Sequence, residues 1–204
     1  PSVATENLYS NNIDGCFMGE VIEIETERLI LRQWRAEDKS PFAKLNADPL
    51  VMEYFPEVLT REQSDDLANR CKALVENNGW GFWALETIAD KRFIGFAGLN
   101  QPDYDLPVSA CVEIGWRLSG DVWGNGYATE AAKACLDFAF QNLVLEEVFA
   151  YSSVGNQKSR NVMERLKMVD LKNNFDHPLF PDNHELKEHV LYKIELQQWK
   201  DIQH

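Results

Sequence analysis

A pair of glycines marks the most chemically suggestive stretch of the sequence, which reads DVWGNGYATEA over residues 121–131. Gly124 and Gly126 follow a strand-like run and directly precede a segment with helical periodicity. Glycine permits a tight turn, and the free N–H groups at the start of a helix attract an anion such as a phosphate. The sequence matches neither a Walker loop nor the dinucleotide fingerprint, because Thr129 occupies the third glycine position. The segment therefore fits either a phosphate-binding loop or a plain strand-to-helix turn.

One carboxylate interrupts an apolar strand. Glu113 lies in the run ACVEIGWRLSG at residues 110–120, and alternation places it on the same face as Gly115 and Arg117. Burial of a carboxylate in a covered sheet raises its pKa, which suits a general base that works near neutral pH. Two other interpretations stay open: Glu113 pairs with a lysine or arginine, or this face of the strand is solvated.

Three further polar residues open a short helical pattern that follows a strand-like run. These residues are Asn156, Ser159 and Arg160. Because asparagine and serine are ordinary capping residues at the start of a helix, the pattern alone indicates capping rather than chemistry.

Histidines gather in one segment, FDHPLFPDNHELKEH, at residues 175–189. The spacings from His177 to His184 and from His184 to His189 are 7 and 5 residues, which match neither a helical nor a hairpin pair of metal ligands. We therefore predict no metal site, and we favour a surface loop with one partly buried histidine. The two prolines make this loop stiff and suited to binding a ligand.

The elements that position these residues follow the order β-α-α-β-β-β-α-β-α-β-β. The first strand is expected to be bulged or bent at Thr26, and Thr60 with Gln63 forms a capping box before the second helix. This order is typical of an α/β or α+β protein with helices on both faces of its sheet. The strand-like runs are at residues 22–34, 79–88, 92–100, 110–120, 146–153, 169–175 and 189–196, and the helical patterns are at 40–45, 61–76, 127–143 and 156–168.

Length and composition limit the classes of function. The 204 residues, 45% of them hydrophobic, suit a single domain at residues 21–204 after a polar, disordered tail at residues 1–20. A net charge of −13 disfavours nucleic acid and mildly favours a cationic ligand such as an amine. No apolar run could cross a bilayer, and the four cysteines form no CxxC pair, so we expect a cytoplasmic protein with no membrane partner.

Several blocks of the sequence together resemble the acetyl-CoA-dependent N-acetyltransferases of the GNAT superfamily. Within it, the similarity is greatest to the group that includes the ribosomal-protein N-terminal acetyltransferases. The resemblance covers about residues 22–196, and blocks in the right order are more specific than any one of them. These blocks are ETERLILRQWRAED, FWALE, FIGFAGL, VEIGWRLSGDVWGNGYATEA and SVGNQKSRNVMERLKM.

The resemblance implies a mixed, splayed sheet of about seven strands with helices on both faces, in which the strands at 110–120 and 146–153 part to admit acetyl-CoA. Trp123 stands where the family usually has a polar residue, but the backbone from Gly124 to Ala128 should still hold the pyrophosphate. Asn156 matches the asparagine on the pantetheine arm. The implied cofactor-binding residues are Trp116, Arg117, Leu118, Trp123, Gly124, Asn125, Gly126, Tyr127, Ala128, Thr129, Asn156, Ser159 and Arg160.

The resemblance also implies catalytic roles. Glu113 would deprotonate the amine, directly or through a water, and backbone N–H groups near Arg117 and Leu118 would stabilise the oxyanion. Ser159 would protonate the departing thiolate, because the helix at 157–168 carries no tyrosine for this role. No metal and no covalent enzyme intermediate are needed. Lys167 replaces the usual glycine after this helix, which leaves the geometry of that turn open.

The acceptor is the least determined partner. The resemblance favours a protein N-terminal amine, with a polyamine or an aminoglycoside-like molecule as the alternative, and an inactive acetyl-CoA-binding regulator as the competing class. Acceptor-binding residues are expected in Pro49 to Thr60, with Tyr54 and Phe55, in the 174–189 loop, with His177, and at Glu113. Both segments could equally only cover the sheet edge. The protein is expected to act as a monomer or a homodimer.

Overall fold

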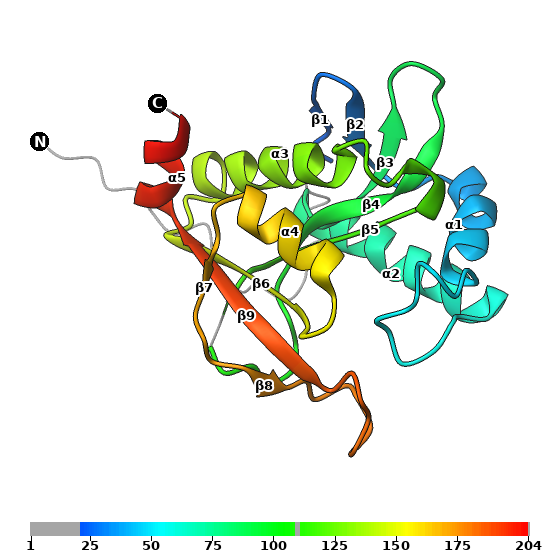
Figure 1. Ribbon diagram of the computed structural model, residues 1–204. Helices are drawn as coiled ribbons and strands as arrows, with labels where there is room; N and C mark the ends of the chain where they lie inside the picture. Colours follow the sequence, from blue (N-terminus) through cyan, green and yellow to red (C-terminus); the bar gives the residue numbers. More distant parts are fainter. Residues whose placement is uncertain (1–20, 109–110, 204) are drawn as a thin grey trace, which may run out of the picture.

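The computed structural model describes residues 21–108 and 111–203, and the predicted tail at residues 1–20 lies outside them. Nine strands and five α-helices alternate along this part of the chain (Figure 1). The strands are β1 (Ile24–Glu25), β2 (Leu29–Arg32), β3 (Phe82–Thr87), β4 (Phe93–Asn100), β5 (Glu113–Leu118), β6 (Glu147–Ser153), β7 (Val169–Asp170), β8 (Phe175–Asp176) and β9 (Glu188–Glu195). The helices are α1 (Lys39–Asn46), α2 (Arg61–Asn78), α3 (Tyr127–Gln141), α4 (Gln157–Arg165) and α5 (Leu196–Gln203), with short 3₁₀ turns η1 (Ala36–Asp38) and η2 (Gly120–Val122).

One mixed sheet contains all nine strands. Its order is β1-β2-β3-β4-β5-β6-β9-β7, and β8 pairs with β9. Every neighbouring pair is antiparallel except β5 and β6, which are parallel. Helices cover both faces, as the sequence predicts, with α1 and α2 on one side and α3, α4 and α5 on the other (Figure 1). The expected splayed α/β architecture is confirmed, with nine strands rather than about seven.

Two predicted strands are each divided in the structure: the run at residues 22–34 forms β1 and β2, and the run at residues 169–175 forms the separate strands β7 and β8. The predicted bulge or bend at Thr26 is wrong, because the chain reverses there and forms the β1–β2 hairpin. The Thr26 N–H donates to the Leu29 carbonyl (2.9 Å), and the Leu29 N–H donates to Thr26 Oγ1 (3.0 Å). Helix α5 was not predicted; its Trp199 is buried and donates from Nε1 to Asp137 Oδ1 of α3 (2.8 Å).

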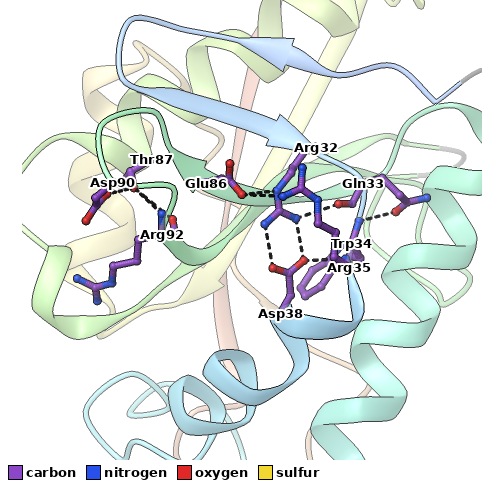
Figure 2. Close-up of polar contacts among 9 residues, drawn as sticks. All are labelled: Arg32, Gln33, Trp34, Arg35, Asp38, Glu86, Thr87, Asp90 and Arg92. Atoms are coloured by element: carbon purple, nitrogen blue, oxygen red, sulfur yellow. Dashed lines mark hydrogen bonds and ion pairs between the residues drawn. The ribbon is translucent and has the colours of Figure 1, made fainter.

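A buried ion-pair network holds the segment between β2 and α1 (Figure 2). Arg32 is 2% exposed and donates from Nη1 to Asp38 Oδ2 (2.7 Å) and from Nε to Glu86 Oε2 (2.8 Å). Arg35 adds a contact from Nη1 to Glu86 (3.1 Å), and its backbone N–H donates to Asp38 (2.7 Å). The charge of Arg32 is therefore compensated by two carboxylates of the protein itself.

The parallel strands β5 and β6 separate soon after they meet. Their backbones pair at Glu113 and Phe149, where the Phe149 N–H donates to the Val112 carbonyl (3.0 Å), and no later pair joins them within the described residues. Because the strands are parallel, their carboxyl ends lie at the same edge of the sheet. The chain enters α3 after β5 and α4 after β6, so two helix N-termini flank the opening between the strands.

The turn after α4 has the conformation that favours glycine. Lys167 adopts φ 62°, in the left-handed region. Its N–H donates to the Glu164 carbonyl and the Met168 N–H donates to the Met163 carbonyl, both at 3.0 Å, which is the hydrogen-bond pattern of a Schellman motif. The substitution of lysine for glycine thus leaves the turn intact and puts strain on its backbone.

Candidate active site

Glu113 is buried at the point where β5 and β6 separate. The residue is 8% exposed, and its Oε1 accepts a hydrogen bond from Asn100 Nδ2 of β4 (2.8 Å). Burial raises the pKa of its carboxyl above the usual value, although hydrogen bonds from Tyr151 and Asn100 act in the opposite direction. No lysine or arginine among the described residues lies within ion-pair distance of Glu113. The interpretations of a paired or a solvated carboxylate are therefore wrong.

Two tyrosines continue the hydrogen bonding from Glu113. The hydroxyl of Tyr151 on β6 is the partner of the carboxylate, and it also contacts the hydroxyl of Tyr104. Burial and the charge of Glu113 raise the pKa of Tyr104 to about 12 and raise the pKa of Tyr151 as well. Both phenols are therefore neutral near pH 7 and can donate hydrogen bonds. Sequence reasoning missed both residues, although the pairing of β5 with β6 makes Tyr151 a neighbour of Glu113.

Two histidines pack beside Tyr151. His177 is 6% exposed and His189 is 5% exposed, and their ring centroids lie 4.7 Å apart. Burial lowers the pKa of His177 to about 4 and lowers the pKa of His189, so both are neutral near pH 7. The prediction of one partly buried histidine is thus wrong. His177 lies 5.4 Å from the Tyr151 ring and its Nδ1 accepts the Leu179 N–H (3.2 Å), so a contact with an acceptor stays a prediction.

The glycine turn lies at the N-terminus of α3 and is open to a ligand. Gly124 and Gly126 have φ angles of 79° and 83°, which residues other than glycine rarely adopt. A Cβ at Gly124 would meet nothing within 4 Å. Gly126 is the N-cap, and no side chain caps the first turn of α3. The N–H groups of this turn are therefore available to an anion, as the phosphate-loop interpretation requires.

Arg28 places a positive charge beside this turn. The residue comes from the β1–β2 hairpin, and its Nη1 donates to the Asn125 carbonyl (3.0 Å). Its Nη2 lies 3.6 Å from where a Cβ of Gly126 would stand, and its guanidinium lies 4.5 Å from the Tyr127 ring centroid. Glu130 pairs with the same guanidinium at 2.6 Å. Sequence reasoning missed Arg28, because its place at the turn depends on contacts far along the chain.

Trp123 and α4 meet across the opening between the two helix N-termini. Trp123 donates from Nε1 to the Leu118 carbonyl (3.0 Å), which fixes the indole at the end of β5. The ammonium of Lys158, on the first turn of α4, lies 4.3 Å from the Trp123 ring centroid and 3.3 Å from Glu53 Oε2. Lys158, which was not predicted, therefore links α4 to the loop before α3 and to the α1–α2 segment.

The other predicted residues of α4 have structural contacts. Asn156 is the N-cap, and its Oδ1 accepts the N–H of half-buried Ser159 (3.1 Å). Arg160 donates to the Val154 carbonyl (3.3 Å) and to the Tyr192 hydroxyl (3.4 Å). The capping role of Asn156 is confirmed, and the cofactor contacts of all three residues stay predictions.

Arg117 of β5 lies on the sheet face that α1 and α2 cover, where its neighbours are an amide and two aromatic rings. Its Nη1 donates to Asn46 Oδ1 (2.7 Å), and its guanidinium carbon lies 4.0 Å from the ring centroid of Phe55 and 5.5 Å from that of Phe96. Its Nε is buried and has no hydrogen-bond partner within the described residues. Burial lowers the pKa of Arg117 to about 10.

The remaining predicted site residues surround the opening. Trp116, Tyr127 and Ala128 pack against the core on the α3 face, Leu118 is buried, and Asn125 is exposed. Tyr54 lies beside the β6–α4 turn, where a Cβ of Gly155 would be 3.5 Å from its ring. The α1–α2 segment, through Tyr54 and Phe55, therefore extends from β5 to the start of α4.

The described residues contain neither a metal-binding group of side chains nor a membrane-spanning helix. In residues 21–108 and 111–203, no group of three or more histidine, cysteine, aspartate or glutamate side chains is arranged to hold a metal ion. No helix in the same ranges is long and apolar enough to span a membrane.

The fold thus combines a mixed sheet with two diverging parallel strands, a glycine turn at the start of α3 beside them, and a buried carboxylate where the strands separate. The family described as an acetyltransferase (GNAT) domain matches residues 28–169. This chain belongs to the GNAT family of acetyltransferases.

Relatives and solved structures agree with this assignment. The FsC-acetyl coenzyme A-N(2)-transacetylase of Aspergillus fumigatus is 30% identical over 192 residues, which cover 88% of this chain and 79% of that protein. A GNAT acetyltransferase from Bacillus anthracis superposes with a TM-score of 0.71 at 24% identity, over 86% of this chain and 99% of the other. The ribosomal-protein-S5-alanine acetyltransferase of Vibrio fischeri superposes with a TM-score of 0.68 at 17% identity, over 87% of this chain and 98% of the other. At these identities the two structures support the fold alone.

Proposed function

We propose that this acetyltransferase moves an acetyl group from acetyl-CoA to a primary amine by direct attack of the amine on the thioester. The observation that carries the proposal is Glu113, a buried carboxylate without a cationic partner, located where β5 and β6 separate. An amine is mostly protonated at pH 7 and must lose a proton before it can attack. A carboxyl whose pKa is raised by burial is suited to accept that proton.

The remaining steps use groups around the opening. Glu113 takes the proton directly or through a water, and the amine nitrogen then attacks the thioester carbonyl carbon. Backbone N–H groups of β5 near Arg117 and Leu118 stabilise the oxyanion, because this edge of β5 has left β6. As the C–S bond breaks, Ser159 on the first turn of α4 protonates the thiolate. The reaction needs neither a metal nor a covalent intermediate on the protein.

Acetyl-CoA is proposed to lie with its pyrophosphate on the backbone of Gly124 to Ala128 and its pantetheine arm between β5 and α4. The uncapped N-terminus of α3 and the nearby charge of Arg28 support this placement. The side chains or backbones proposed to contact the cofactor are those of Trp116, Arg117, Leu118, Trp123, Gly124, Asn125, Gly126, Tyr127, Ala128, Thr129, Asn156, Ser159 and Arg160.

The acceptor is proposed to enter between the α1–α2 segment and the 174–189 loop, past Tyr54 and Phe55. The 174–189 loop carries four acidic residues and Pro49 to Thr60 carries two, and the net charge of −13 attracts an amine. A protein N-terminal amine is the first candidate and a small-molecule amine the second. The Aspergillus relative, whose name describes acetylation at N(2) of FsC, favours the second. The proposed setting is the cytoplasm, with the protein acting as a monomer or homodimer.

The test measures turnover on a panel of peptides, polyamines and aminoglycosides, with the release of free CoA as the signal. Wild-type protein should acetylate at least one amine, and Glu113→Gln should lower kcat by about 10²–10⁴-fold with little change in the KM for acetyl-CoA. Glu147→Gln, which alters an exposed carboxylate on β6, is the matched control and should retain activity. Acetyl-CoA binding without turnover on any amine would instead support a cofactor-binding regulator.

A further inference from the structure

Arg117 is a cation of β5 whose Nε is buried, and no carboxylate in the described part of the chain pairs with it. Among the described residues, its only hydrogen-bond acceptor is Asn46 Oδ1 (2.7 Å), and no acidic side chain lies within ion-pair distance of it. Its Nε is buried and unpartnered. A buried charge without a partner costs stability, so such an arrangement is most readily explained by an anion that comes from outside the protein.

The geometry around Arg117 leaves a direction open for such an anion. The ring of Phe55 covers one face of the guanidinium at 4.0 Å, and Phe96 lies at 5.5 Å. Aromatic rings contact the face of a guanidinium, whereas carboxylates bind the N–H groups in its plane. Arg117 has five such N–H groups and uses one on Asn46. Arg117 as a residue is not fully buried, which leaves part of its surface open to solvent.

The guanidinium shares a strand face with the base. Glu113 and Arg117 are four residues apart on β5, so their Cα atoms are separated by roughly 13 Å. Gly115 between them carries no side chain, and the ring of Phe82 lies over it, 3.1 Å from where a Cβ would stand. A ligand can therefore contact both charged groups along an apolar surface.

We propose that Arg117 binds a carboxylate of the acceptor, so that the preferred substrate is a primary amine that also carries a carboxylate. This inference rests on the proposed function. Two sources share this chemistry: a free ω-amino acid, and a peptide whose acidic side chain lies near its N-terminal amine.

The experiment compares pairs of amines that differ only in the carboxylate. 5-Aminopentanoate is paired with butylamine, and a peptide amide with glutamate at its second position is paired with its glutamine counterpart. The wild-type protein should prefer the acidic member of at least one pair by about ten-fold or more in kcat/KM, expressed mainly in KM. The pair that shows the preference identifies the source of the carboxylate.

Variants of Arg117 then separate binding from structure. Arg117→Met should bring the preference close to one, whereas Arg117→Lys should keep part of it, since lysine retains the charge but not the planar fork. Arg61→Met, which alters an exposed arginine of α2, should leave the ratio as in wild type. An equal loss for both members of a pair in Arg117→Met, or no acid preference in wild type, overturns the inference. No turnover on any amine overturns the proposed function instead.

Discussion

Two arginines on the same face of the sheet have opposite surroundings. Arg32 on β2 contacts Asp38 and Glu86, and those carboxylates outweigh the effect of burial and raise its pKa (Figure 2). Arg117 on β5 contacts Asn46 and two aromatic rings, and burial lowers its pKa to about 10. The first charge is satisfied within the fold, whereas the second is left for a ligand.

The two long helices show the same difference at their N-termini. Thr60 caps α2, where its Oγ1 accepts the Gln63 N–H (3.2 Å) and the Gln63 side chain accepts the Thr60 N–H (2.7 Å). Gly126 begins α3 and offers no side chain to its first turn. The first turn of α2 is thus capped by the protein's own side chains, whereas that of α3 is left open at the proposed pyrophosphate position.

Loss of Arg32 should have the largest effect on stability. Arg32→Met leaves Asp38 and Glu86 buried without a partner, so we expect unfolding free energy to fall by about 3–5 kcal/mol. Arg117→Met removes an uncompensated charge but also a hydrogen bond to Asn46, and should change stability by about 1 kcal/mol or less. Urea denaturation of both variants measures the difference. Equal destabilisation by the two substitutions would contradict the assigned roles.

Gly126→Val should weaken acetyl-CoA binding by at least about ten-fold, because a side chain there blocks the approach of the pyrophosphate to the backbone. Calorimetric titration of the folded variant with acetyl-CoA provides the measurement. Gly79→Val is the matched control: Gly79 has φ 78°, close to the 83° of Gly126, but ends α2. Similar backbone strain is thus introduced at a helix end with no proposed ligand. Unchanged affinity in Gly126→Val would falsify the placement of the pyrophosphate.

Tyr151→Phe should move the acid limb of the kcat/KM profile to higher pH. The hydrogen bond from Tyr151 favours the charged carboxylate and lowers the pKa of Glu113, so its removal raises that pKa. A protonated Glu113 cannot accept a proton, and activity is therefore lost at a higher pH than in wild type. A shift toward lower pH, or none, would mean that Tyr151 does not act on Glu113.

Lys167→Gly should produce the smallest effect, a stabilisation of about 1 kcal/mol or less. Lysine is strained at φ 62°, and glycine adopts that angle freely, although glycine also gains more entropy in the unfolded chain. Thermal unfolding measures the change, and acetyl transfer should remain as in wild type. A destabilised variant would show that the Lys167 side chain contributes more than its backbone strain costs.

Local patterns in the sequence predicted the scaffold well. The capping box at Thr60, the helix after Gly126 and the strand around Glu113 each depend on neighbours in sequence, and each is present. The reversal at Thr26 was missed, because apolar alternation continues on both sides of the turn. A single bent strand and a tight hairpin give almost the same pattern there.

Contacts between distant segments account for the site residues that were missed. Arg28, Lys158 and Tyr151 lie at the candidate site only because β1–β2, α4 and β6 fold against α3 and β5. Nothing near them in sequence indicates a role. The lack of a carboxylate beside Arg117 among the described residues could not be predicted either, because a sequence shows a charge but not which side chains lie next to it.

The pH dependence of kcat/KM for acetyl transfer in wild type and Glu113→Gln tests the central claim most directly. Burial raises the pKa of Glu113, so wild-type activity should fall as the pH drops through a value above that of an ordinary glutamate. Glu113→Gln should be slower by about 10²–10⁴-fold and should lack this acid limb, with acetyl-CoA binding retained. Wild-type rates and an unaltered acid limb in Glu113→Gln would contradict the assignment of Glu113 as the base.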